Sequence, residues 1–170
     1  MNIPLSLSRL NANREVFVAL AQNISEEQAR WKPAPDVWSV LEVFCHLYDE
    51  EREDFRQRVR LTLESPEMDW PPINPLGWVT ERQYYTRAWP EAVAAFVQER
   101  QASLAWLNNL SNPNWDSTHT HPRFGSATAG DMLSAWAAHD HLHIRQLNEL
   151  HWQWYARTAP AGALDYAGGW

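Results

Sequence analysis

Apolar residues recur at helical spacing in four long stretches of the chain. When each stretch is wound as a helix, with about 3.6 residues per turn, the apolar residues gather on one side and the polar residues on the other. Proline-rich segments separate the stretches, which is typical of connections between helices. The predicted helices span 5–23, 39–63, 90–110 and 128–150, with a further single turn at 25–32.

Three of the predicted helices carry recognisable start signals. Ser39 is followed three residues later by Glu42, the pattern of a capping box, in which both side chains bond free backbone N–H groups of the first turn. Thr128 and Asp131 repeat this spacing before the last helix, and Pro90 suits a first helical turn. These residues predict where the helices begin.

The fold class follows from the helices and from the weakness of strand signals. The chain has no alternating β-branched run and no Asn-Gly or Asp-Gly turn. Helices without a sheet bury their apolar sides against one another, so we expect an all-α four-helix bundle forming a single domain over residues 1–170. The connection from Ser65 to Trp89 is long, as in functional lids or in bundles with parallel neighbours.

The net negative charge of the chain argues against some classes of binding partner. The formal net charge is −7 and the sequence pI is about 5.4. The protein therefore lacks the positive field that attracts nucleic acid or anionic lipid, and neither is an expected partner. Acidic residues interrupt the local arginine cluster, which predicts a solvated helix face; the arginines are Arg52, Arg56, Arg58 and Arg60, and the acidic residues are Glu51, Glu53 and Asp54. Eleven tryptophans predict an aromatic pocket or a partner surface.

The single cysteine and the lack of long apolar runs favour a cytoplasmic protein. Cys45 has no partner for an internal disulfide, and no apolar run approaches the ~20 residues of a membrane span. The first ten residues lack the basic and apolar regions of a signal peptide. We interpret Cys45 as a small apolar helix residue rather than a nucleophile.

Two histidines on the last predicted helix form a pair with metal-ligand spacing. At about 100° per residue, His139 and His143 lie about 40° apart on the apolar side, whereas His141 points nearly opposite. Two histidines four residues apart also occur in a zinc motif, but that motif needs a glutamate where this chain has Asp140. The pair alone is compatible with metal ligation and with ordinary hydrogen bonding to a neighbouring helix.

His46, on the second predicted helix, is the candidate third ligand. It adjoins core positions of that helix, and Glu50 follows one turn later. Three imidazoles with an open coordination position suit zinc, nickel, iron or manganese, and spacing does not choose among them. Glu50 has three open interpretations: it orients a ligand, it contacts a bound water, or it is a surface charge.

The remaining histidines have simpler interpretations. His119 and His121 fall in the predicted loop from Asn114 to Thr128, where we expect solvated side chains. His151 lies near the end of the last helix, where the helix dipole favours a positive charge.

Three separate patches resemble the DinB superfamily, particularly its DinB-like and YfiT-like metal-dependent branch. They extend over nearly the whole chain and keep their order and spacing. The patches are Trp38-Ser39-Val40-Leu41-Glu42-Val43 with His46-Leu47, the loop around Trp115 with His121-Pro122-Arg123-Phe124-Gly125, and Trp136-Ala137-Ala138-His139-Asp140 with His143-Ile144-Arg145-Gln146-Leu147.

This resemblance implies a fold, a ligand set and a range of activities. The implied fold is a bundle of up-down-down-up topology with a long connection between helices two and three. The implied ligands are His46, His139 and His143, with zinc or nickel as the metal, and homodimers are common in the family. Some relatives are transferases or isomerases that use bacillithiol, mycothiol or glutathione, and many have no assigned reaction.

Two functional hypotheses follow. In the first, the protein is a metal-dependent thiol S-transferase or hydrolase, whose partners are a small-molecule thiol and an electrophile. Arg145 or Arg123 then binds a substrate carboxylate and Glu50 or Asp140 handles a proton, although the helical wheel turns Arg145 away from the histidines. In the second, the metal is structural and the protein is a binding module. A metal-free bundle with ordinary core histidines is a third reading.

Overall fold

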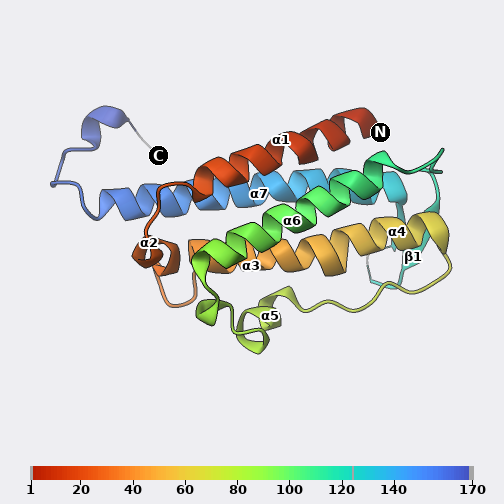
Figure 1. Cartoon of the computed structure of the whole chain (residues 1–170), viewed down its shortest axis with the longest axis horizontal. Coiled ribbons are helices and arrows are strands. Elements are labelled where there is room, and N and C mark those ends of the chain that lie inside the picture. Colours follow the sequence, from red (N-terminus) through yellow and green to blue (C-terminus); the bar gives the residue numbers. More distant parts are fainter. Residues whose placement is uncertain (1, 124, 169–170) are drawn as a thin grey trace.

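Four long helices lie side by side in the computed structural model, which describes residues 2–123 and 125–168 (Figure 1). The second is continuous but contains three segments, the middle one a π-helix. The helices are α1 (Ile3–Ala21), α3 (Val40–Asp49) with η1 (Glu50–Phe55) and α4 (Arg56–Glu64), α6 (Trp89–Asn108), and α7 (Ala129–Ala156). The all-α four-helix bundle expected from the sequence is confirmed. None of the described helices combines the length and apolar character that crossing a membrane requires.

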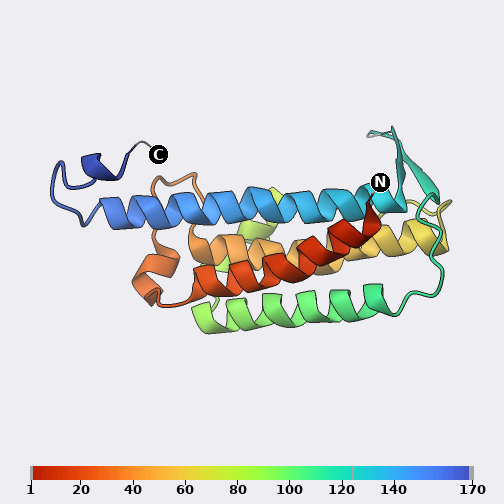
Figure 2. The ribbon, with the colours of Figure 1, turned by 90° about the horizontal axis from the view of Figure 1, so that it is seen from above.

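The helices have the up-down-down-up order. Figures 1 and 2 show α3–α4 and α6 running in one direction while α1 and α7 run in the other. Each helix packs on two others, because α1 contacts α6 and α7, and the α3–α4 helix contacts the same two. The long connection returns the chain along the bundle and contains α5 (Pro75–Glu81) and η2 (Tyr84–Thr86); the predicted turn near 25–32 is α2 (Glu26–Arg30).

Capping boxes set the starts of α3 and α7, as the sequence predicts. Ser39 accepts a hydrogen bond from the backbone N–H of Glu42, whose carboxylate accepts one in return. Thr128 and Asp131 bond in the same reciprocal way. Because these two helices carry all three candidate ligands, the residues at which the helices begin determine the position of each ligand along the bundle axis.

A buried ion network joins all four helices. The Arg100 guanidinium on α6 donates to Glu51 on η1 at 2.9 Å and to both carboxylate oxygens of Asp140 on α7 at 2.8 and 2.7 Å. Asn13 on α1 also donates to Asp140, and the Trp136 indole donates to Glu51, each at 3.1 Å. At most 1% of Arg100, Glu51 and Asp140 is exposed. Their charges are therefore compensated by one another rather than by water.

The structure corrects part of the predicted solvated face between residues 52 and 60: Arg52 and Arg60 are exposed, but Asp54 among them is buried. In a π-helix the hydrogen bonds run from residue i to i+5, so the segment after Asp49 turns more slowly than an α-helix. Adjacent Glu50 and Glu51 are both buried, and Asp54 is buried with them. Glu50 follows His46 by four residues and Asp54 follows Glu50 by four, so helical spacing places both on the same side of the helix as His46.

A small hairpin corrects the prediction that strands are absent. β1 (Thr118–His121) pairs antiparallel with β2 (Gly125–Thr128), so that Thr118 faces Thr128. Gly125 has φ +76°, which glycine adopts without a steric penalty. Strands of four residues are too short for an alternating pattern to stand out. Phe124, part of the motif quoted above, lies outside the described residues.

Replacing Asp140 with Asn tests the importance of the buried network. The amide leaves part of the Arg100 charge uncompensated, and we expect the free energy of unfolding to fall by about 3 kcal/mol. Glu26→Gln is the matched control: Glu26 pairs with Arg30 on the exposed surface of α2, so its loss should cost less than about 1 kcal/mol. Urea unfolding measures both. Equal, small effects would show that the network does not stabilise the bundle.

Candidate metal centre

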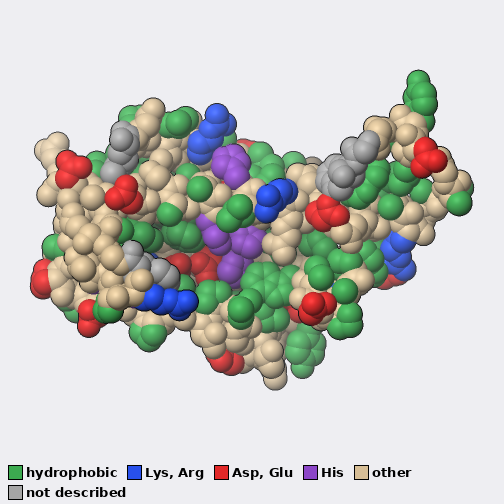
Figure 3. Space-filling view, turned by 180° about the vertical axis from the view of Figure 1, so that it is seen from behind, with side chains coloured by type: hydrophobic (Ala, Val, Ile, Leu, Met, Phe, Trp, Pro, Cys, Tyr) green, Lys and Arg blue, Asp and Glu red, His purple; other side chains and the backbone are tan. Residues whose placement is uncertain are grey.

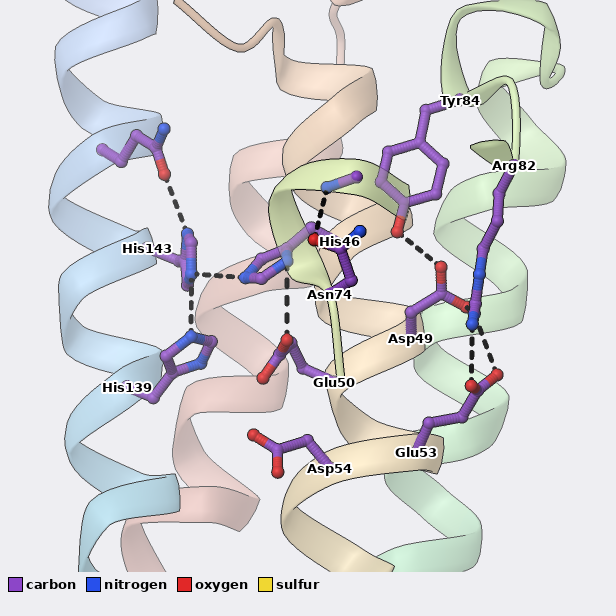
Figure 4. Close-up of polar contacts among 12 residues, drawn as sticks. His46, Asp49, Glu50, Glu53, Asp54, Asn74, Arg82, Tyr84, His139 and His143 are labelled. Carbon is purple, nitrogen blue, oxygen red and sulfur yellow. Dashed lines mark hydrogen bonds and ion pairs between the residues drawn. The ribbon is translucent and has the colours of Figure 1, made fainter. Parts of the chain in front are cut away.

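The three predicted ligands meet between α3 and α7 (Figure 4). The Nε2 atom of His143 lies 3.1 Å from the Nε2 atom of His46 and 3.1 Å from that of His139. One nitrogen from each ring lies within 4.8 Å of the other two. The helices thus direct three imidazole nitrogens toward one point.

Hydrogen bonding of His143 indicates what belongs at that point. Its Nδ1 atom lies 2.8 Å from the Oε1 atom of Gln146, which only accepts, so Nδ1 carries the proton and Nε2 has a lone pair. A single lone pair does not accept hydrogen bonds from both His46 and His139. A cation that takes lone pairs from all three rings satisfies them together. The donor set therefore fits a divalent metal ion.

Burial keeps these rings neutral, as metal ligation requires. Desolvation, strengthened by the other two histidines, lowers the pKa of His46 to about 2. Desolvation also lowers the pKa of His139 to about 3, with further contributions from His143 and the Arg100 guanidinium. The pKa of His143 is lowered mainly by burial. In the metal-free protein all three lone pairs are available at neutral pH.

Two acidic residues of the π-helix, Glu50 and Asp54, lie beside the three histidines (Figure 4). Only 4% of Glu50 is exposed, and its Oε1 atom stands 3.9 Å from the Nδ1 atom of His46. Burial and the neighbouring Asp54 carboxylate raise the pKa of Glu50 to about 9. Asp54 in turn pairs with Arg58. The surface-charge interpretation of Glu50 is wrong, because this carboxyl group belongs to the interior beside the cluster.

An open cavity leads to the cluster. It encloses about 470 Å³, and its lining includes His139 and His143 together with apolar residues of α7 and of the segment before α3. In Figure 3 histidine side chains lie at the bottom of a hollow bordered by hydrophobic side chains. Arg145 also lines this cavity, although the helical wheel predicted that it leaves the pocket. A long arginine side chain reaches around the helix surface farther than its Cα direction suggests.

Comparison with known proteins identifies the family and agrees with the fold. A family model described as the DinB superfamily matches residues 9–147. The chain belongs to the DinB superfamily. Among solved structures it is similar to YfiT from Bacillus subtilis, described as a probable metal-dependent hydrolase with an unusual four-helix bundle topology. The two share 18% sequence identity with a TM-score of 0.77, over 89% of this chain and 86% of YfiT. No curated protein matches the chain.

Two other residues proposed for the site of this DinB-superfamily protein lie elsewhere. Both oxygens of Asp140 bond Arg100 in the buried network, so this carboxylate holds the helices together rather than handling a proton. Arg123 lies in the exposed turn of the hairpin and does not line the cavity that contains His139 and His143.

His119 and His151 differ from their predicted surface roles. His119 is 3% exposed, donates from Nδ1 to the backbone oxygen of Pro66 and stacks on Trp70. His151 lies between the Leu20 carbonyl and the Gln28 amide, and burial lowers its pKa, so it is neutral rather than a cation at the helix end. Both rings hold separate segments together.

Cys45 has the predicted apolar character. It is buried, and desolvation raises its pKa to about 12. A thiol that stays protonated at neutral pH is a poor nucleophile. Sulfur chemistry at the metal centre would therefore need a thiol from outside the chain.

Metal analysis of single variants tests the ligand set. In protein purified without an affinity tag, we expect near-stoichiometric divalent metal in the parent and its loss in His46→Ala, His139→Ala and His143→Ala. His141→Ala is the matched control, because His141 is exposed on the same helix and should leave the metal content unchanged. Inductively coupled plasma mass spectrometry gives the stoichiometry. Retention of metal in any two of the three ligand variants would disprove this site.

Acid sensitivity of the metal-free protein tests the neutral state of His139. Its pKa is about 3 when folded against an ordinary 6.5, so below pH 6.5 only the unfolded chain binds a proton there. Acidification then favours unfolding, and the parent should lose about 1.4 kcal/mol per pH unit relative to His139→Gln between pH 6 and about pH 5. Urea unfolding at several pH values measures the difference in unfolding free energy between the parent and His139→Gln, and His141→Gln should parallel the parent. A difference that does not change with pH would contradict a buried neutral ring at His139.

Proposed function

We propose that this protein binds one divalent metal ion through His46, His139 and His143 and uses it to hydrolyse a small molecule. The observation that carries the proposal is the convergence of three neutral imidazole nitrogens, two of which belong to residues that line an open cavity. Zinc or nickel is the proposed metal, and iron or manganese also suits such ligands. The description of YfiT as a probable metal-dependent hydrolase supports the same reaction class.

Residues around the three histidines have different roles in such a reaction. When bound, a divalent metal supplies Lewis acidity, which polarises the scissile carbonyl and makes water reactive near neutral pH. Gln146 accepts from the Nδ1 atom of His143 and so keeps its Nε2 atom free. The Oε1 atom of Glu50 has no hydrogen-bond partner among the described residues. Without metal the raised pKa keeps this carboxyl protonated, whereas the charge of a bound cation would favour its ionised form. The ionised Glu50 would then take the proton that water releases on attack and pass it to the leaving group.

A second candidate function is the transfer of a low-molecular-weight thiol to an electrophile. The same metal chemistry activates a thiol, and the buried Cys45 is not available as an internal nucleophile. The thiol would then enter through the open cavity as a substrate. A purely structural metal is less well supported, because structural zinc sites are closed by four protein ligands. Here the cluster has three histidines, and two of them line an open cavity.

Turnover by metal-loaded protein tests the proposal. The panel contains small esters and amides, and electrophiles offered with glutathione, bacillithiol or mycothiol. We expect hydrolysis that requires the metal, and we expect Glu50→Gln to lower kcat by about a hundredfold while the metal content stays unchanged. His141→Ala should behave as the parent. Thiol transfer without hydrolysis would favour the second candidate, and inactivity with both panels would support a structural or binding role.

A further inference from the structure

The cavity beside the three histidines combines apolar walls with one positive charge. Its volume of about 470 Å³ lies within the roughly 300–1,000 Å³ of small-molecule sites. Val37, from the segment between α2 and α3, and Leu142, from α7, line it from two elements. They are 36% and 54% exposed. Large apolar side chains at the mouth of a polar site offer contact area to the carbon skeleton of a ligand.

Arg145 supplies the positive charge. Its side chain is exposed and lines the same cavity as His139 and His143, two residues beyond the latter on α7. Glu149 also lines the cavity, but its carboxylate accepts from Gln153, and the described residues contain no ion pair to Arg145. A guanidinium left without a carboxylate partner beside a candidate reaction centre is available for an anionic ligand.

We propose that the cavity selects small monocarboxylates with an apolar body, and that Arg145 binds the carboxylate. This inference rests on the proposed function, because it places the group to be cleaved at the three-histidine cluster. The skeleton then packs on Val37 and Leu142, and the guanidinium holds the carboxylate through paired hydrogen bonds. A single carboxylate fits better than a polyanion, since one arginine faces the cavity and the chain carries a net charge of −7.

Matched hydroxamic acids test this inference without a known substrate, because the hydroxamate group binds an accessible metal ion. The probes are hexano- and octanohydroxamic acid, and the monohydroxamates of adipic and suberic acid, in which a carboxylate replaces the terminal methyl group. Isothermal titration calorimetry with zinc-loaded protein gives each affinity. We expect the carboxylate to improve binding by about tenfold or more for the better-fitting chain length.

Variants of Arg145 test whether this residue is responsible for the gain in affinity that the carboxylate brings. Arg145→Ala should remove the advantage of the carboxylate and leave the affinity for the plain hydroxamic acids nearly unchanged. Arg145→Lys should keep part of it, because charge is retained without the paired geometry. Arg9→Ala is the control, since Arg9 is exposed on α1.

The outcomes separate this inference from the proposed function. Plain hydroxamic acids that bind only the zinc-loaded protein, with a carboxylate advantage that depends on Arg145, support both. The same metal-dependent binding with no advantage, or with one that survives Arg145→Ala, overturns the role of Arg145 and leaves the open metal centre intact. Failure of all probes to bind the zinc-loaded protein contradicts an accessible metal and overturns both.

Discussion

The buried ion network around Arg100 is the constraint on which the rest of the structure depends. A guanidinium and two carboxylates withdrawn from water are tolerated only when each charge meets its partners, so α6, η1 and α7 must approach in one register. Asp140 adjoins the candidate ligand His139, and Glu51 adjoins Glu50. Trp136 links the network to the site, because it bonds Glu51 and stacks on Phe55, whose ring centroid lies 4.9 Å from that of His139. The network therefore orients the candidate metal centre as well as the bundle.

The π-helical segment carries two buried acidic side chains that contact different parts of the structure. It turns Glu51 toward Arg100 while Glu50 faces the histidines, although the two residues are adjacent in sequence. Short π-helical segments inside α-helices are frequent at functional sites. In this protein the segment separates a carboxylate that compensates a buried cation from a carboxyl group that stays protonated near neutral pH without metal. Their different partners account for their different roles.

The sequence predicts the helices and the ligands better than it predicts what surrounds them. Capping boxes and helical spacing locate the starts of α3 and α7, and the four-residue spacing of His139 and His143 places both rings on one side of a helix. The position of His46 beside core residues of its helix made it the candidate third ligand, and the family resemblance supported that choice. The π-helix, the burial of Glu50 and the hydrogen bonds of His119 depend on contacts between distant segments, which local patterns do not encode. The homodimer and the cytoplasmic location expected from the sequence stay predictions.

The central claim is that three imidazole nitrogens, one from α3 and two from α7, hold a single metal ion with room for a further ligand. X-ray absorption spectroscopy of the zinc-loaded protein tests it most directly. We expect three imidazole nitrogens at about 2.0–2.1 Å, with the outer-shell scattering of imidazole rings, and at least one additional oxygen in the first coordination shell. A shell that contains sulfur, or fewer than three imidazoles, would contradict the assigned ligands, and a fourth protein ligand closing the shell would contradict the open site.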